Sequence, residues 1–120
     1  MALHSERLLE HFQNPRNVGR LEAPAVTVHV ENPACGDTMR LAARFEGDCV
    51  AEVRYQVRGC TASIAAGSAL TEWMMGKTRA ELAGISPEVI DAALGGLQPA
   101  SKHVGILCAD AVKKLLVAVS

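Results

Sequence analysis

The chain has few aromatic residues, almost no net charge and no long apolar run. Aromatic side chains make up 3% of its 120 residues, so a platform for stacking nucleic-acid bases is not expected. A formal net charge of −1 gives no electrostatic reason for nucleic acid or an anionic membrane to bind. No stretch approaches the roughly 18 consecutive apolar residues that a membrane span needs. We therefore expect neither a nucleic-acid partner nor a membrane partner.

The N-terminal residues Met1–Arg7 are polar and charged, and they lack the apolar run of a signal peptide. This predicts a cytoplasmic protein whose thiols stay reduced. Four cysteines in that setting indicate metal-binding, reactive or buried thiols rather than a disulfide framework. A length of 120 residues suits one core, so residues 1–120 are expected to form a single domain.

Three segments alternate between apolar and polar residues at every second position, which predicts strands buried on one face. They are residues 26–31, 38–46 and 49–58, with Gly47-Asp48 as a tight hairpin between the last two. Helical spacing, capping residues and glycine stops predict helices around them. These begin at Ser5, after Cys60, at Thr78, at Ser86 and after Ser101. The fold class is α+β, a small antiparallel sheet with helices on its dry face and water on the other.

Two cysteines lie where the chain must turn. Cys35 is beside Gly36 in a Pro-x-Cys-Gly-Asp turn, and Cys60 follows Gly59 where the third strand gives way to a helix. In a three-stranded meander, the first and third strands end at the same edge, which would bring Cys35 and Cys60 together. Asp37, two residues after Cys35, and His103, at the start of the last helix, can reach that edge. Two thiolates, a carboxylate and an imidazole are good ligands for zinc or iron.

Each of these residues also has an ordinary structural interpretation. Cys35 could be a loop cysteine, and Cys60 could be a buried thiol at a helix start. His103 could be exposed in a first helical turn, and Asp37 could accept hydrogen bonds from backbone N–H groups of its turn. The metal site is favoured because all four are expected at one edge.

The other two cysteines favour core packing. Cys49 falls on the apolar face of the third strand by alternation. Cys108 belongs to the apolar stripe of the last helix, one turn beyond Val104. Cys108 is kept as an alternative metal ligand because it shares that face.

Four stretches in order resemble the IscU/NifU-type iron–sulfur cluster scaffold family over nearly the whole chain. They are residues 11–19 (HFQNPRNVG), 32–37 (NPACGD), 59–65 (GCTASIA), and His103 with Ile106-Leu107 and Asp110-Ala111 behind it. The resemblance implies an α+β fold and a carrier that is not itself an enzyme. It also implies a transient [2Fe-2S] cluster or zinc in one site, a cysteine desulfurase as sulfur donor, an iron donor and recipient apo-proteins.

The chain departs from the family pattern at two places. Val104 stands where the family has its third cysteine, which is both a ligand and the usual acceptor of sulfur. The matching ligands are therefore Cys35, Asp37, Cys60 and His103. Residues 97–101 (LQPAS) do not keep the Leu-Pro-Pro-Val-Lys motif through which an Hsp70-type chaperone recognises the family, which argues against that partner.

The leading hypothesis is thus a scaffold or carrier for iron–sulfur cluster assembly. Val104 motivates an alternative, a diverged zinc-binding relative that docks on a cysteine desulfurase and modulates it without building clusters. A zinc hydrolase with three protein ligands and an open water position is a third hypothesis. It is disfavoured because no general base is evident nearby.

Overall fold

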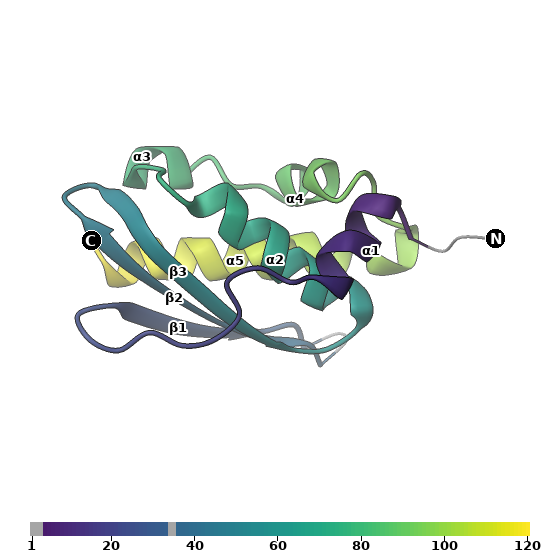
Figure 1. Cartoon of the computed structure of the whole chain (residues 1–120), viewed down its shortest axis with the longest axis horizontal. Helices are drawn as coiled ribbons and strands as arrows, with labels where there is room; N and C mark the ends of the chain where they lie inside the picture. Colours follow the sequence, from purple (N-terminus) through teal and green to yellow (C-terminus); the bar gives the residue numbers. More distant parts are fainter. Residues whose placement is uncertain (1–3, 34–35) are drawn as a thin grey trace.

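A computed structural model describes residues 4–33 and 36–120 of the chain. Helix α1 comes first, three strands follow it, and four further helices come after the strands, with a short 3-10 turn before the last helix (Figure 1). Their bounds are α1 Glu6–Gln13, β1 Val26–Glu31, β2 Thr38–Glu46, β3 Cys49–Arg58, α2 Thr61–Met74, α3 Arg79–Leu82, α4 Pro87–Ala93, η1 Pro99–Ser101 and α5 His103–Ala118.

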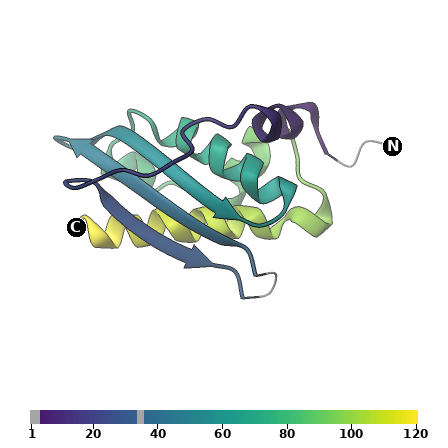
Figure 2. The same cartoon turned by 60° about the horizontal axis from the view of Figure 1, so that its bottom comes forward.

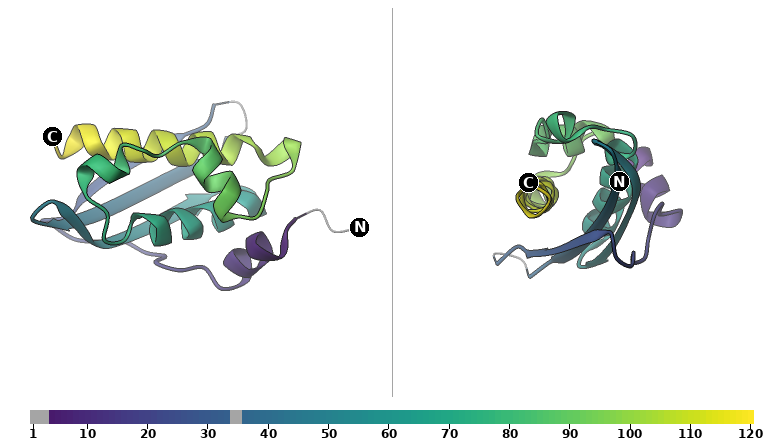
Figure 3. Two further views of the ribbon diagram at one scale, coloured as in Figure 1. Left: turned by 90° about the horizontal axis from the view of Figure 1, so that it is seen from above. Right: turned by 90° about the vertical axis from the view of Figure 1, so that its left-hand side faces the viewer.

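The three strands form one antiparallel sheet in the order β1-β2-β3. Because β2 lies in the middle, β1 and β3 run parallel to each other and end at the same edge. We call this edge, where β3 leads into α2, the site end of the sheet. Helices α2 and α5 lie along one side of the strands in Figure 1, and α3 and α4 lie outside them (Figure 3, left). The predicted α+β class is confirmed.

The local signals for the helices are also confirmed. The Ser5 side chain caps α1 by accepting a hydrogen bond from the Leu8 N–H, and Thr78 forms the expected capping box with Glu81 at the start of α3. Pro87 occupies the first turn of α4. Within the described ranges, no helix is both long enough and apolar enough to cross a membrane.

Small residues let α2 approach the sheet closely. Ala65, Ala66 and Gly67 are buried, and a Cβ atom built on Gly67 would lie 2.2 Å from the ring of Tyr55. The Tyr55 hydroxyl donates a 2.7 Å hydrogen bond to the carbonyl of Ile64. Glycine at position 67 is therefore needed for the Tyr55 ring to pack this closely against α2, and this contact fixes the helix that begins at the candidate site.

The outer face of the sheet is only partly open to water, in contrast to the prediction of one wet side. The segment between Gly19 and Ala25 crosses this face on its way to β1 (Figure 2). Ala42 points outward by strand alternation, yet its exposed fraction is 2%. The site-end half of the outer face remains open, with Arg40, Gln56 and Arg58 exposed.

The expectation that Cys49 packs in the core is wrong, because Cys49 is exposed. The reason is a β-bulge. Arg44 pairs with Glu52, but Phe45 pairs with Val50, which leaves Ala51 without a partner on β2. One extra residue reverses the alternation of side chains along β3. Val53 and Tyr55 face the core on one side of the bulge, Val50 faces it on the other, and Cys49 turns outward.

Candidate metal centre

Three of the residues predicted to bind a metal meet at the site end of the sheet. Asp37 lies just before β2, Cys60 is the residue that caps α2, and His103 is the first residue of α5. One potential ligand atom from each lies within 4.8 Å of the other two, and this is the one group of three or more such side chains within the described parts of the chain. Residues 37, 60 and 103 come together because three separate elements end or begin at this edge.

The carboxylate of Asp37 is the centre of this group. Its Oδ2 atom lies 3.3 Å from Nε2 of His103 and 3.6 Å from Sγ of Cys60. Asp37 is 6% exposed, whereas Cys60 is exposed and His103 is partly buried. The group is therefore closed on the carboxylate side and open to solvent on the thiol side. A metal or a reacting partner can reach it from the side of Cys60.

Hydrogen bonds keep Asp37 ionised at neutral pH. Burial alone would raise the pKa of this carboxyl, but hydrogen bonds from Ser63, His103 and Cys60 together outweigh burial and leave the pKa below its ordinary value. No lysine or arginine forms an ion pair with Asp37 among the described residues. The negative charge is therefore available to a cation at this site.

Gly59 makes room for the carboxylate. A Cβ atom at position 59 would lie 2.6 Å from Cγ of Asp37 and 2.7 Å from its Oδ1. Any other residue at this position would force the Asp37 side chain away from Cys60. The glycine before Cys60 therefore allows close packing of two chain segments.

Ser63 is a site residue that the sequence analysis did not identify. It is fully buried in the first turn of α2, where its hydroxyl donates a short hydrogen bond to Oδ2 of Asp37. The Oγ atom of Ser63 lies 3.1 Å from Sγ of Cys60. A serine three residues after a cysteine at a helix start would have been the available signal, since such a pair lies on one helix face.

Cys35 and Cys108 are the other two cysteines that the sequence analysis considers as ligands. Cys35 lies outside the described residues, so its role as a fourth ligand stays a prediction. Cys108 is fully buried in the core, and burial raises the pKa of its thiol to about 12. Val104 is also fully buried. The apolar stripe predicted for the last helix is thus confirmed.

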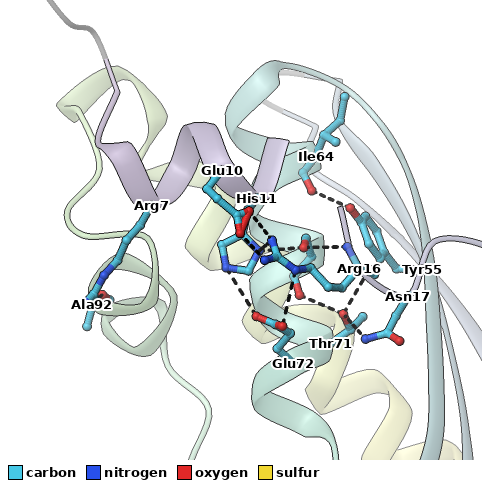
Figure 4. A network of polar contacts seen from close by, with 11 residues as sticks. Arg7, Glu10, His11, Arg16, Asn17, Tyr55, Ile64, Thr71, Glu72 and Ala92 are labelled. Atoms are coloured by element: carbon cyan, nitrogen blue, oxygen red, sulfur yellow. Dashed lines mark hydrogen bonds and ion pairs between the residues drawn. The ribbon is translucent and has the colours of Figure 1, made fainter. Parts of the chain in front are cut away.

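A second polar cluster holds α2 against the N-terminal segment. We call it the α1–α2 clamp. Its members are Glu10, His11, Arg16 and Glu72, which are labelled in Figure 4, and Ser68, which bonds to His11 and Arg16. The Ser68 hydroxyl lies 2.7 Å from Nδ1 of His11 and accepts a 2.9 Å hydrogen bond from the Arg16 N–H. Arg16 also pairs with Glu10 and lies 3.6 Å from Glu72. The motif at residues 11–19 therefore anchors the helix that carries Cys60 and Ser63.

The donor set suits zinc or iron. Thiolate, imidazole and carboxylate each bind these metals, and all three are present, with a hydrogen-bonded carboxylate that forms no ion pair with lysine or arginine among the described residues. Ser63 supplies the kind of second hydrogen bond that orients a ligating carboxylate. The residues that the structure describes therefore fit a metal centre completed by one or more further ligands.

These observations define a class of protein. It is a small α+β domain with a thiolate, a carboxylate and an imidazole at one end of its sheet. The NifU-like N terminal domain family matches residues 3–119, so the chain belongs to this family. The chain is 37% identical over 115 residues to the iron-sulfur cluster assembly scaffold protein IscU 1 of Archaeoglobus fulgidus. This match covers 96% of the chain and 75% of that protein. It is 40% identical over 114 residues to the scaffold protein IscU of Azotobacter vinelandii, covering 92% and 88%.

The fold is shared with solved structures at lower identity. A crystal structure described as an iron-sulfur cluster assembly scaffold protein for the SUF system, from Fervidobacterium islandicum AW-1, superposes with a TM-score of 0.77. The two chains are 19% identical, and the match covers 95% of this chain and 96% of the other. At that identity the likeness supports the fold, and the family rests on the sequence relatives.

Proposed function

We propose that this protein is a scaffold or carrier in iron–sulfur cluster assembly, acting as a single domain over residues 1–120. The observation that carries the proposal is the meeting of Asp37, Cys60 and His103 within 4.8 Å, in a chain whose relatives are named as assembly scaffolds. Cys35 is proposed as the fourth ligand. The support for Cys35 is its place in the sequence, two residues before Asp37.

The cargo would be a [2Fe-2S] cluster, and zinc would bind the same ligands. A cluster of this type needs four terminal ligands, and sets with fewer thiolates differ in stability and potential from all-cysteine sets. Two thiolates, one carboxylate and one imidazole should hold a cluster less firmly than four thiolates would. A loosely held cluster suits a protein that builds its cargo and passes it on, and the exposed side of Cys60 gives partners access.

The partners of the proposed reaction are a cysteine desulfurase as sulfur donor, an iron donor and recipient apo-proteins. The protein would be used stoichiometrically, as a carrier rather than an enzyme, and the chemistry of sulfur release would belong to the donor. Cys60 is the described thiol that can accept sulfur, because it is exposed within the ligand group. Cys108 is buried, which excludes it from contact with a donor in this conformation. The cytoplasmic location stays a prediction.

Anaerobic reconstitution tests the proposal. Protein incubated with ferrous iron and sulfide should develop visible absorption bands, with about two irons and two sulfides per site. Folded protein that develops no bands would contradict the scaffold role. Protein purified without oxygen that holds stoichiometric zinc and no labile sulfide would instead favour the zinc-binding alternative.

A further inference from the structure

The open half of the sheet's outer face carries an arginine cluster that the metal centre does not use. A hollow of about 430 Å³ is lined by Arg20, Arg40 and Arg58, together with His29, Thr38, Gln56 and Val57. Arg58 lies two residues before Cys60, and Thr38 follows Asp37 directly. The hollow therefore adjoins the chain segments that carry Asp37 and Cys60. We call it the arginine face.

Arginines at the two ends of the sheet's outer face differ in their partners. At the hairpin end, Arg44 donates a 2.7 Å hydrogen bond to Glu52 and lies 3.5 Å from Glu46, and Arg54 lies 4.0 Å from Glu52. At the site end, neither Arg40 nor Arg58 forms an ion pair with a carboxylate in the described ranges.

The third arginine of the face, Arg20, is bonded to a neutral group, because it donates a 2.9 Å hydrogen bond to the amide oxygen of Gln56. Glu31 stands on the same face, in the row of Thr38, and belongs to none of the ion pairs among the described residues. The site end therefore keeps a local excess of positive charge, in a chain whose net charge is −1.

The spacing of the two free arginines matches an extended peptide. Arg40 of β2 lies opposite Gln56 of β3. Arg58 lies two residues beyond Gln56 on β3, so the two arginines are diagonal neighbours. Diagonal neighbours in an antiparallel pair are about 7–8 Å apart. Alternate residues of an extended chain are about 7 Å apart and point the same way. Carboxylates at every second position of such a chain can therefore meet both guanidinium groups.

We propose that the arginine face is a docking surface for an extended acidic segment of a partner protein, with Asp or Glu at alternate positions. Guanidinium groups bind carboxylates in a planar, two-pronged geometry, which favours carboxylate partners at a site of paired arginines. A partner docked here would lie beside Cys60. The further conclusion that this partner exchanges iron or sulfur at the metal centre rests on the proposed function, whereas the docking itself does not.

A peptide titration tests the docking. The probe is an acetylated peptide of alternating threonine and glutamate with three glutamates, added to 15N-labelled protein while the side-chain Nε–Hε signals of arginine are followed by NMR. We expect the signals of Arg40 and Arg58 to shift, and the shifts to weaken as salt increases. The double variant Arg40→Gln/Arg58→Gln should bind the peptide roughly threefold to tenfold more weakly.

Matched controls separate docking from general charge attraction. Lys77→Gln/Lys113→Gln removes the same charge from two residues that do not line the hollow, so its peptide affinity should equal that of the wild type. A peptide with three consecutive glutamates should bind more weakly than the alternating one, and a glutamine peptide should not bind. Equal affinity in the arginine and lysine double variants would overturn the proposal. So would equal binding of the two acidic peptides, or displacement of the alternating peptide by equimolar inorganic phosphate, which would indicate a small-anion site.

Discussion

The α1–α2 clamp and the metal centre both include residues of α2, and they differ in how their charges are paired. In the α1–α2 clamp, Arg16 is surrounded by Glu10 and Glu72, so positive and negative groups are already paired. In the metal centre, Asp37 has hydrogen-bond donors but no lysine or arginine partner among the described residues. A set of paired charges holds segments together. A carboxylate, a thiol and an imidazole without a permanent cation form a place where a cation can bind.

The largest effect is expected on zinc affinity when a proposed ligand of the metal centre is removed. Cys60→Ala or His103→Ala removes one of four proposed ligands and should weaken zinc binding by roughly a hundredfold. The measurement is competition with a chromophoric chelator at pH 7. Cys49→Ala is the matched control, because Cys49 is exposed and far along β3 from the site end. Equal zinc affinity in Cys60→Ala and Cys49→Ala would remove Cys60 from the ligand set.

Two fully buried serines of α2 allow the two clusters to be tested separately. Ser63 bonds to Asp37 of the metal centre, and Ser68 bonds to His11 and Arg16 of the clamp. Ser63→Ala removes the hydroxyl that orients Asp37, and metal affinity should fall about tenfold to a hundredfold, as for other groups that orient ligands. Ser68→Ala leaves the Arg16 N–H and the His11 ring without their shared partner. It should lower the free energy of unfolding by about 1–3 kcal/mol.

The two serine variants are read with two assays, zinc competition and denaturant unfolding of metal-free protein. Ser68→Ala should keep the zinc affinity of the wild type. If Ser63→Ala also kept it, Ser63 would have only a packing role. If Ser68→Ala weakened zinc binding as much as Ser63→Ala, the clamp and the metal centre would be one cooperative unit.

Acid should weaken the clamp before it weakens most of the fold. Burial, and then the charge of Arg16, lower the pKa of His11 below its ordinary value of 6.5, while Glu72 and Glu10 oppose them. The unfolded chain therefore takes up this proton first as the pH falls. The stability that neutral His11 contributes is complete above pH 6.5 and is lost as the pH falls toward its lower folded pKa.

His11→Gln tests this dependence. It removes the titrating group but keeps a side chain that can hydrogen-bond to Ser68. We expect the free energy of unfolding of the variant, measured in urea between pH 5 and pH 7.5, to change less with pH than that of the wild type. Equal slopes in the two proteins would contradict the assignment of this pH dependence to His11.

The smallest expected effect on the metal comes from Cys108. Because its thiol is buried, with a pKa raised to about 12, Cys108→Ser should leave zinc affinity and sulfur uptake unchanged. It should lower stability, since a hydroxyl is harder to bury than a thiol. A loss of zinc affinity in folded Cys108→Ser protein would show that this sulfur moves to the site when metal binds.

The elements of the fold were largely predictable because their signals are local. Alternation located the three strands, and helical spacing located the first helix. The capping box at Thr78 and the proline at position 87 marked two further helix starts that the structure confirms. The position of Cys49 was not predictable, because the bulge at Ala51 depends on how β3 pairs with β2 rather than on its own sequence. The crossing of the outer face by the segment after Gly19 depends in the same way on tertiary packing.

The candidate site was predictable at the residues whose type is a common metal ligand. Cys60, Asp37 and His103 were expected at one edge, and the structure places them there. Ser63 was missed because serine is common in helices and its role depends on the distance to Asp37, which only the fold sets. The arginine face was missed for a related reason, since a single net charge near zero conceals where the charges lie.

X-ray absorption at the zinc edge of the metal-loaded protein tests the account most directly, because it counts the ligand atoms. Two cysteines, Asp37 and His103 predict two sulfur atoms at about 2.3 Å and two nitrogen or oxygen atoms at about 2.0–2.1 Å, with one sulfur lost in Cys60→Ala. A zinc shell that contains no sulfur, or a shell that Cys60→Ala leaves unchanged, would contradict the account.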